Sequence, residues 1–479
     1  MNRKEIVLKT LRHEPVEQVP WVPFAGVHAG LLKNYTAKEV LQDGDKLFQS
    51  LIEVNRLYKP FGQPVVFDLQ IEAECLGCGL VWAEDTPPSV VSHPLEDEDE
   101  IHVPCKCTIP TKDSGRIPMV LDVMRRMKEA VGENTALYGL VCGPFTLAAH
   151  LRGNNIFMDM YDDEDTVAEF LGYCSAVAAR MAEYYVEAGM DVIAVVDPLI
   201  SQISEDHFEQ FMHEPFTGLF DHIRELGAFS SFFVCGDATR NIEAMCRTAP
   251  DSISIDENVD IFVAKAVTDR YNITLGGNIP LTTVMLHGTQ QDNMKFVLDL
   301  LDKMEAEHSM EAEHSMEEKH SMEEKHSMEV TRNFILAPGC DMPYHVPVEN
   351  VIGIAQAVLE PEKVREMLSN YVAQEDDTEV ILPDYEHLER PLMEVFTLDS
   401  ATCAACTYMM GAAREAKKAF GDSLDMVEYK FTEKESIARC RKMGVTNLPS
   451  LYINGELKFC SLVPSRQELE QAVKEVMPK

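Results

Sequence analysis

Two cysteines that follow short apolar runs are the residues of this sequence best suited to chemistry. Cys235 ends the run Phe232-Phe233-Val234, and Cys340 follows Ile335-Leu336-Ala337-Pro338-Gly339. If the fold brings these strand ends together, the two thiolates can hold one zinc ion and leave coordination positions open. Zinc of this kind lowers the pKa of a bound thiol and makes it a nucleophile. The third ligand of such a site is not evident beside either cysteine, and packed core thiols remain the alternative for both.

A second cysteine pair, Cys403-Ala404-Ala405-Cys406, lies between a predicted strand and the start of a predicted helix. A helix N-terminus stabilises a thiolate, so we expect a lowered pKa for Cys403, with Cys406 as the resolving thiol. Pro449 enters a later strand, at a position compatible with a cis peptide bond. The order of these elements favours thiol–disulfide chemistry. The alternative, a structural zinc knuckle, lacks a second pair of ligands.

Eight apolar runs that read as strands alternate with amphipathic runs that read as helices. The expected strands are Val19–Phe24, Val65–Gln70, Ala136–Phe145, Asp191–Leu199, Ser230–Asp237, Ser252–Asp256, Thr274–Ile279 and Phe334–Cys340. Among the helices between them, we expect one over Ala37–Lys59 and one over Val348–Leu368. This alternation predicts the α/β class, as a (β/α)₈ TIM barrel rather than an open doubly wound sheet.

Polar and reactive residues occur at the carboxyl ends of these strands, where such barrels place their sites. They are Asp68, Cys142, Asp197, Cys235, Asp256, Glu257, Asn278 and Cys340. Strand ends are also polar because they meet water, which is the structural alternative. We expect Asp68, Asp197 and Asn278 to face a substrate if the site is catalytic.

The chain divides by composition into a large and a small unit. Residues 1–372 carry the barrel pattern, the acidic and proline-containing residues 373–390 read as a linker, and residues 391–479 form a small α/β unit. A hexapeptide repeat over 305–328 places four histidines that cannot converge on one metal while helical. We expect a surface helix extension or a disordered loop there and assign it no function.

Charge and cysteine usage restrict the partners. The net charge of −38 repels phosphate backbones and anionic lipids, which argues against nucleic acid and membrane partners. Most of the 13 cysteines lie singly in apolar runs, as in a reducing compartment. With no signal-peptide pattern and no apolar stretch of spanning length, a cytoplasmic protein is expected.

The N-terminal segment Asn2–Pro15 resembles the uroporphyrinogen decarboxylase superfamily. Further matching motifs are Glu72–Cys78, Gly143–Ala148, Ser252–Glu257, Gly276–Pro280 and Ala337–Cys340. The decarboxylases bind porphyrinogen carboxylates through arginines near the first strand, and the stretch Trp21–His28 has none. The chain is therefore more similar to the corrinoid-dependent branch, typified by methylcobamide:coenzyme M methyltransferases. Residues 391–479 resemble a thioredoxin-like or glutaredoxin-like domain, which implies a redox or thiol-binding role for Cys403, Cys406 and Pro449.

The resemblance implies a methyltransferase that moves a methyl group between a methylcobamide and a small thiol at a zinc–thiolate site. The branch carries a His-x-Cys…Cys site, which corresponds here to Phe233, Cys235 and Cys340. Glu257 is the expected third ligand, and the other candidates are Asp197, Cys142 and His345. The corrinoid is expected on a separate protein, since no Asp-x-His-x-x-Gly motif occurs in the chain. The resemblance implies that Asp68, Asp197 and Asn278 face the substrate or this corrinoid.

Two other functions stay open. In the first, the barrel is a metal-free binding platform for a thiol–disulfide oxidoreductase that acts on a thiol–disulfide partner. In the second, the barrel is a porphyrinogen decarboxylase. Cys75 and Cys78, and likewise Cys105 and Cys107, have the close spacing of metal ligands and are secondary candidates.

Overall fold

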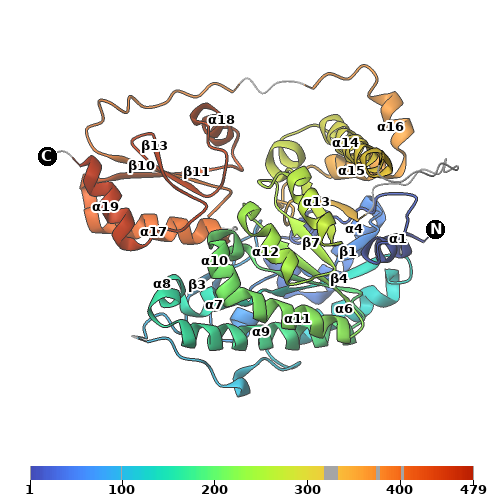
Figure 1. The fold of residues 1–479 in the computed structure, drawn as a ribbon, viewed down its shortest axis with the longest axis horizontal. Coiled ribbons are helices and arrows are strands. Elements are labelled where there is room, and N and C mark those ends of the chain that lie inside the picture. The colour runs from blue at the N-terminus through green and yellow to red at the C-terminus, as the bar shows by residue number, and fades with distance from the viewer. Residues whose placement is uncertain (1, 99, 318–332, 374–377, 401–403, 478–479) are drawn as a thin grey trace.

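The fold is taken from a computed structural model that describes residues 2–98, 100–317, 333–373, 378–400 and 404–477. For residues 307–317 and 404–405 it describes the backbone alone. The chain folds into a TIM-barrel-like α/β unit followed by a thioredoxin-like unit with a small mixed sheet (Figure 1). Both parts of the predicted fold class are confirmed.

Seven parallel strands form the sheet of the first unit, in the order β1-β4-β5-β6-β7-β8-β9. Their bounds are Gly62–Pro64 (β1), Ala136–Cys142 (β4), Val192–Val196 (β5), Phe229–Val234 (β6), Ser252–Ile255 (β7), Thr274–Ile279 (β8) and Phe334–Pro338 (β9). Nearly every side chain of these strands is buried, as expected for a parallel sheet covered by helices. A small antiparallel hairpin, β2 (Gly79–Val81) and β3 (Ser89–Ser92), stands apart from this sheet.

The segment around Trp21 lies between the two edge strands of this sheet. Trp21 forms an isolated parallel bridge with Leu336 of β9, and Val22 N donates to Leu336 O at 2.9 Å. On the other side, Phe61 N donates to Trp21 O at 2.9 Å, just before β1. The predicted strand Val19–Phe24 is thus reduced to one bridge, which links β9 to β1.

The predicted strand Val65–Gln70 is wrong in position, because the pairing strand is β1, three residues earlier. Val65, Val66 and Phe67 are buried, but they lie in the segment that leaves β1. The apolar run therefore reflected burial rather than strand pairing.

Helices surround the sheet and connect its strands. Those of the first unit are α1 (Arg3–Leu11), α2 (His28–Leu31), α3 (Ala37–Gln42), α4 (Gly44–Tyr58), α5 (Ile71–Cys75), α6 (Ile117–Val131), α7 (Pro144–Arg152), α8 (Asn155–Asp162), α9 (Glu164–Glu187), α10 (Glu205–His207), α11 (His213–Glu225), α12 (Ile242–Arg247), α13 (Ile261–Arg270), α14 (Gln290–Glu317), α15 (Val348–Leu359) and α16 (Pro361–Met367). Short 3-10 or π segments are η1 (Lys106–Thr108), η2 (Pro198–Gln202), η3 (Phe208–Met212), η4 (Thr239–Asn241) and η5 (Leu281–Leu286).

Two predicted helices are each divided in two, for reasons that the sequence contains. The predicted helix 37–59 breaks at Asp43, whose carboxylate accepts from Asp45 N and Lys46 N and so caps α4. The predicted helix 348–368 breaks before Pro361, which begins α16. Helix α14 runs into the hexapeptide repeat as far as Glu317, so the helix extension is confirmed for that part. The rest of the repeat lies outside the described residues.

The second unit has a four-stranded sheet in the order β11-β10-β12-β13, in which β10 and β11 are parallel and the other pairs antiparallel. Its elements are β10 (Leu392–Thr397), α17 (Ala404–Phe420), η6 (Gly421–Ser423), β11 (Asp425–Lys430), α18 (Lys434–Met443), β12 (Ser450–Ile453), β13 (Glu456–Cys460) and α19 (Arg466–Val476). The Leu448–Pro449 peptide bond is cis, as anticipated. Among the described residues, no helix combines the length and apolarity needed to cross a membrane.

The second unit packs on the first through α17, which contacts η2 and the region of α8 (Figure 1). Tyr408 of α17 is only 7% exposed and belongs to the hydrophobic core of the barrel. Its ring meets the ring of Phe157 edge-on, with 6.1 Å between the ring centroids. The two units therefore share buried apolar surface.

Candidate active site at the barrel mouth

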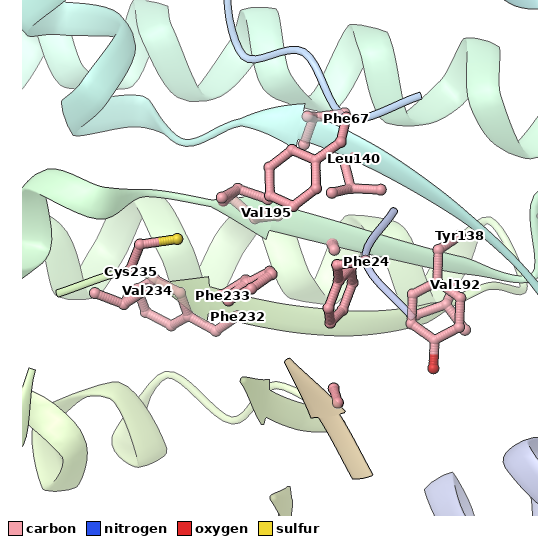
Figure 2. Close-up of a cluster of buried hydrophobic side chains, with 14 of the residues drawn as sticks. Phe24, Phe67, Tyr138, Leu140, Val192, Val195, Phe232, Phe233, Val234 and Cys235 are labelled. Carbon is pink, nitrogen blue, oxygen red and sulfur yellow. The ribbon is translucent and has the colours of Figure 1, made fainter. Parts of the chain in front are cut away.

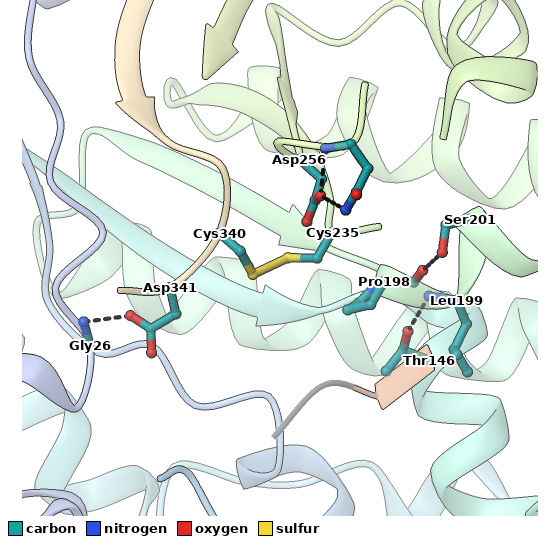
Figure 3. The surroundings of a disulfide bond; sticks show 10 residues. Gly26, Thr146, Pro198, Leu199, Ser201, Cys235, Asp256, Cys340 and Asp341 are labelled. Atoms are coloured by element: carbon teal, nitrogen blue, oxygen red, sulfur yellow. Dashed lines mark hydrogen bonds between the residues drawn. A yellow bond between two sulfur atoms is a disulfide. The ribbon is translucent and has the colours of Figure 1, made fainter. Parts of the chain in front are cut away.

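Cys235 and Cys340 meet at the carboxyl-terminal end of the barrel, where they form a disulfide (Figure 3). Cys235 directly follows β6, and Cys340 comes two residues after β9. Strands β7 and β8 separate β6 from β9 in the sheet, yet the two Cα atoms are 5.8 Å apart. The closure of the sheet therefore brings together two residues that are 105 positions apart in the sequence.

Two glycines make this approach sterically feasible. Gly236 has a φ of +89°, which side chains rarely adopt, and directly follows Cys235. At Gly339, a Cβ atom would lie 2.6 Å from Glu257 N, so only glycine lets the loop before Cys340 pass this close to the loop after β7.

Phe233, at the position where the resemblance implies a histidine, packs inside the barrel (Figure 2). Its ring lies 4.8 Å from the ring of Phe24 and 6.0 Å from that of Phe67, between centroids. Side chains alternate along a strand, so Phe233 and Cys235 share the inner face of β6 while Phe232 packs outward against Phe216. The ring that replaces the imidazole is thus part of an apolar cluster under the disulfide.

The donor set of this site does not fit a zinc ion in the form the structure describes. The sulfurs of Cys235 and Cys340 are bonded to each other and are not thiolates. Among the described residues, no group of three or more His, Cys, Asp or Glu side chains is arranged to hold a metal ion. Glu257, the expected third ligand, accepts a hydrogen bond from Leu281 N, and burial together with the Asp256 charge raises its pKa to about 8. Its role as a ligand stays a prediction.

The other expected ligands have structural partners. The Asp197 carboxylate caps α7, accepting from Phe145 N at 2.8 Å and from the Thr146 hydroxyl at 2.6 Å. Burial raises the Asp197 pKa to about 7. The Cys142 thiol is fully buried, and its pKa is raised by burial. His345 is exposed and its Nε2 lies 3.3 Å from Asp85 Oδ2.

Asp68 and Asn278, expected to face a substrate or a corrinoid, are buried as well. Asp68 forms an ion pair with Arg116 and accepts from Gln70 N at 2.9 Å. Asn278 donates through Nδ2 to Asp256 O at 2.9 Å and to Val259 O at 2.8 Å. Neither residue lines the cavity described next, nor does Asp197, and their functional role stays a prediction.

A cavity of about 480 Å³ lies between the barrel mouth and the second unit. Cys235 and Cys340 line it on the barrel side, and Leu398, Asp399, Cys406, Thr432 and Leu448 line it on the other. Cys406 is buried, and its sulfur accepts from Leu398 N at 3.3 Å. Cys403 lies outside the described residues. The cavity thus joins the barrel disulfide to the second cysteine of the Cys-x-x-Cys motif and to the residue before Pro449.

The docking contacts around this cavity are polar and specific. The Asn447 amide donates to the Asp237 carboxylate, and His287 Nε2 donates to Thr432 O at 2.9 Å. Both contacts connect a barrel loop at the mouth with a loop of the second unit next to the cavity wall.

His150 is a residue of the cavity wall that the sequence pattern did not single out. It lies near the end of α7, is 5% exposed, and burial lowers its pKa to about 3. The run Thr146–Leu151 has the pattern of a core helix. The histidine within this apolar run is the one signal in it that could have indicated a functional residue. His150 O accepts from the Cys78 thiol at 3.1 Å.

The secondary cysteine pairs take no part in this cavity. Cys105 and Cys107 form a disulfide at the surface with 5.2 Å between Cα atoms. Cys75 is half-buried and Cys78 is buried, and burial raises the pKa of both thiols. Neither pair lies in the cavity wall.

Residues 2–360 match the family model described as Uroporphyrinogen decarboxylase (URO-D), and residues 393–474 match the Thioredoxin domain model. The Methylcobamide:CoM methyltransferase MtbA of Methanosarcina mazei is 29% identical over 298 residues, which are 60% of this chain and 86% of that protein. The Methylcobamide:CoM methyltransferase MtaA of Methanosarcina barkeri is 25% identical over 366 residues, 74% of this chain and 96% of that protein. A Uroporphyrinogen decarboxylase of Prochlorococcus marinus is 22% identical over 317 residues, 63% of this chain and 88% of that protein.

Among solved structures, a methyltransferase from Methanosarcina mazei has a TM-score of 0.62 and 20% sequence identity. The match covers 77% of this chain and 99% of that one. It supports the barrel fold of the first unit.

Proposed function

Because the chain belongs to the uroporphyrinogen decarboxylase family and has methylcobamide:CoM methyltransferases among its relatives, we propose that it is a corrinoid-dependent methyltransferase. It moves a methyl group between a methylcobamide on a separate corrinoid protein and a small thiol. The observation that carries the proposal is the meeting of Cys235 and Cys340 on the wall of a cavity at the barrel mouth. Barrels of this kind place their sites at that end.

The reaction exchanges a methyl group without net oxidation or reduction. The thiolate of the small thiol attacks the methyl carbon, a carbon–sulfur bond forms, and the carbon–cobalt bond breaks. The electron pair of that bond stays with the corrinoid, which leaves as cob(I)amide. The cavity of about 480 Å³ is large enough for a small thiol.

Zinc remains the expected metal only for the reduced cysteine pair. Reduction would convert Cys235 and Cys340 into two thiols that can ionise and bind a soft metal. Among the described residues no third donor is in place beside this pair, so the oxidised site has no complete ligand set for zinc.

The second unit supplies a reductant for this pair. We infer that the Cys403/Cys406 dithiol reduces the Cys235–Cys340 disulfide by thiol–disulfide exchange. The Cys403 thiolate attacks one barrel sulfur and expels the other as a thiolate, and Cys406 then attacks Cys403 and releases the second barrel cysteine. Two electrons pass to the barrel, and an external dithiol regenerates the Cys403/Cys406 pair. Cys406 on the wall that faces the disulfide supports this role.

The test combines metal content with turnover. The reduced chain is expected to bind zinc stoichiometrically and to demethylate methylcobalamin to cob(I)alamin when a thiol is added. Cys235→Ser is expected to lose both properties, with Cys246→Ser, a buried cysteine outside the site, as the control. If the reduced chain binds no metal and forms no cob(I)alamin, the proposal is wrong.

A metal-free oxidoreductase is the second candidate, favoured by the match of residues 393–474 to the Thioredoxin domain model. It predicts disulfide reductase activity that depends on Cys403 and is unaffected by Cys235→Ser. Porphyrinogen decarboxylation has less support, because no lysine or arginine occurs among the described residues of the cavity wall to bind its carboxylates.

A further inference from the structure

Two side chains of the cavity wall hold buried polar atoms that have no partner among the described residues. These atoms are both ring nitrogens of His150 and Oε1 of Gln70. Buried polar atoms are nearly always hydrogen-bonded in native proteins, so each exception calls for an explanation. Both residues line the cavity of about 480 Å³ and also a smaller cavity of about 170 Å³, whose wall includes Arg414. Their position on these walls points to a bound ligand as the missing partner.

The hydrogen-bonding capacity of these atoms restricts that ligand. Burial keeps the His150 imidazole neutral, so one ring nitrogen donates and the other accepts. Gln70 Oε1 only accepts. Two of the three unpartnered atoms are therefore acceptors, and a ligand that satisfies them must bring hydrogen-bond donors.

The charges of the wall restrict the ligand further. The described residues of the larger cavity include no lysine or arginine, and its acidic residues are Asp85, Asp256, Asp341 and Asp399. Burial raises the pKa of Asp256 and, to about 8, that of Asp341, so the lack of cations is the feature that matters for an anionic ligand. An anionic group that enters this cavity loses hydration and meets no cationic side chain in exchange. A neutral or cationic group avoids that cost.

We propose that the small thiol substrate carries a hydroxyl or ammonium group and no anionic group, with His150 and Gln70 as its polar contacts. This inference rests on the proposed methyl transfer. It separates the chain from its relatives whose names state coenzyme M, because the sulfonate of that thiol is an anion that can only accept hydrogen bonds. The substrate class is thus a short hydroxy- or aminothiol.

Calorimetric titration of the full chain with three methyl thioethers of one chain length tests the substrate class. The thioethers stand for the methylated product and cannot exchange with the disulfide. 2-(Methylthio)ethanol or 2-(methylthio)ethylamine is expected to bind at least about tenfold more tightly than 2-(methylthio)ethanesulfonate. Equal or tighter binding of the sulfonate, or no binding of any of the three, would overturn the inference.

Substitution of Gln70 tests whether the preference arises at this wall. Gln70→Arg adds a cation and removes an acceptor, and it is expected to raise the affinity for the sulfonate at least about tenfold relative to Gln70→Met. If Gln70→Arg and Gln70→Met bind the sulfonate with equal affinity, the ligand binds elsewhere and the inference is contradicted. A turnover assay distinguishes failure of the ligand class from failure of the proposed methyl transfer. If the chain binds the hydroxy thioether but methylates no thiol, the ligand class stands and the methyl transfer is contradicted.

Discussion

The side-chain amide of Asn447 in the thioredoxin-like unit donates a hydrogen bond to the carboxylate of Asp237 in the barrel. Asn447 lies two residues before Pro449, and Asp237 lies two residues after Cys235. The Asp237 carboxylate also accepts from Thr239 N at 3.1 Å and from the Thr239 hydroxyl at 2.6 Å, which fixes its orientation. One hydrogen bond thus connects the barrel loop that follows Cys235 with the loop of the second unit that contains Pro449.

Asn447→Ala is expected to slow the reduction of the Cys235–Cys340 disulfide by the second unit. A hydrogen bond to a carboxylate contributes about 1.5–3 kcal/mol, so a loss of about tenfold or more in rate is expected if docking limits the exchange. The measurement is the fraction of alkylated Cys235 over time after addition of a dithiol reductant. Asn370→Ala, an exposed asparagine on the barrel, is the control. If the disulfide is reduced at the same rate in Asn447→Ala and Asn370→Ala, the Asn447–Asp237 contact does not contribute to the exchange.

Cys406→Ser is expected to accumulate a disulfide between Cys403 and one of the two barrel cysteines. Without the resolving thiol, the mixed disulfide formed by Cys403 cannot be released within the chain. Peptide mapping under non-reducing conditions identifies the linked peptides. Cys440→Ser is the matched control, because Cys440 is a buried cysteine of the same unit that does not line the cavity. Failure to find any link between the units in Cys406→Ser would rule out the internal reduction.

The fold was largely predictable because its elements follow local patterns. The runs of β4 to β9 are apolar and bounded by polar or glycine residues, and the structure places a strand in each. The strand predicted over 65–70 was wrong because hydrophobicity reports burial and not pairing. Trp21 makes its bridge through tertiary contacts with Leu336, which no local pattern encodes.

The candidate site was predictable only in part. The motifs identified Cys235, Cys340 and Cys406, since cysteines after strands or in a Cys-x-x-Cys pattern carry their own signal. His150 and Gln70 could not be predicted as site residues, because the cavity that they line forms only where the second unit packs on the barrel. The sequence pattern of either unit alone does not predict how the two units pack. Whether two cysteines form a disulfide or bind a metal likewise depends on the third donor, which spacing alone does not locate.

Glu72→Gln is expected to flatten the pH dependence of barrel stability. Glu72 is buried, and desolvation raises its pKa from 4.5 to about 7 in the folded chain. A carboxyl with a raised folded pKa contributes stability that is fully present below about pH 4.5 and is lost as the pH rises through about 7. The wild-type barrel is therefore expected to lose on the order of 2–3 kcal/mol from this group between these pH values.

The measurement for Glu72→Gln is the barrel unfolding transition by calorimetry at several pH values between 4.5 and 8. The amide keeps an oxygen to accept from Cys142 N, a contact of 3.0 Å in the wild type, and carries no charge at any pH. Glu129→Gln, on an exposed position of α6, is the control. A parallel pH dependence in Glu72→Gln and wild type would show that this carboxyl does not titrate in the folded state.

Phe233→His is expected to raise the zinc affinity of the reduced chain. Phe233 and Cys235 share the inner face of β6, so an imidazole at position 233 would add a nitrogen donor beside the two thiolates. The substitution also places a polar ring in the aromatic cluster with Phe24 and Phe67, at a cost on the order of 2–4 kcal/mol in stability.

Phe233→Leu separates these two effects, because it disturbs the same cluster without adding a donor. Competition against a chromophoric chelator, under reducing conditions, gives the zinc affinity of each variant. Phe233→His is expected to bind zinc at least about tenfold more tightly than Phe233→Leu and wild type, since a third ligand completes the donor set. If the three chains bind zinc equally, position 233 does not limit metal binding. The wild-type pair would then have to draw its third ligand from elsewhere, with Glu257 as the first residue to substitute.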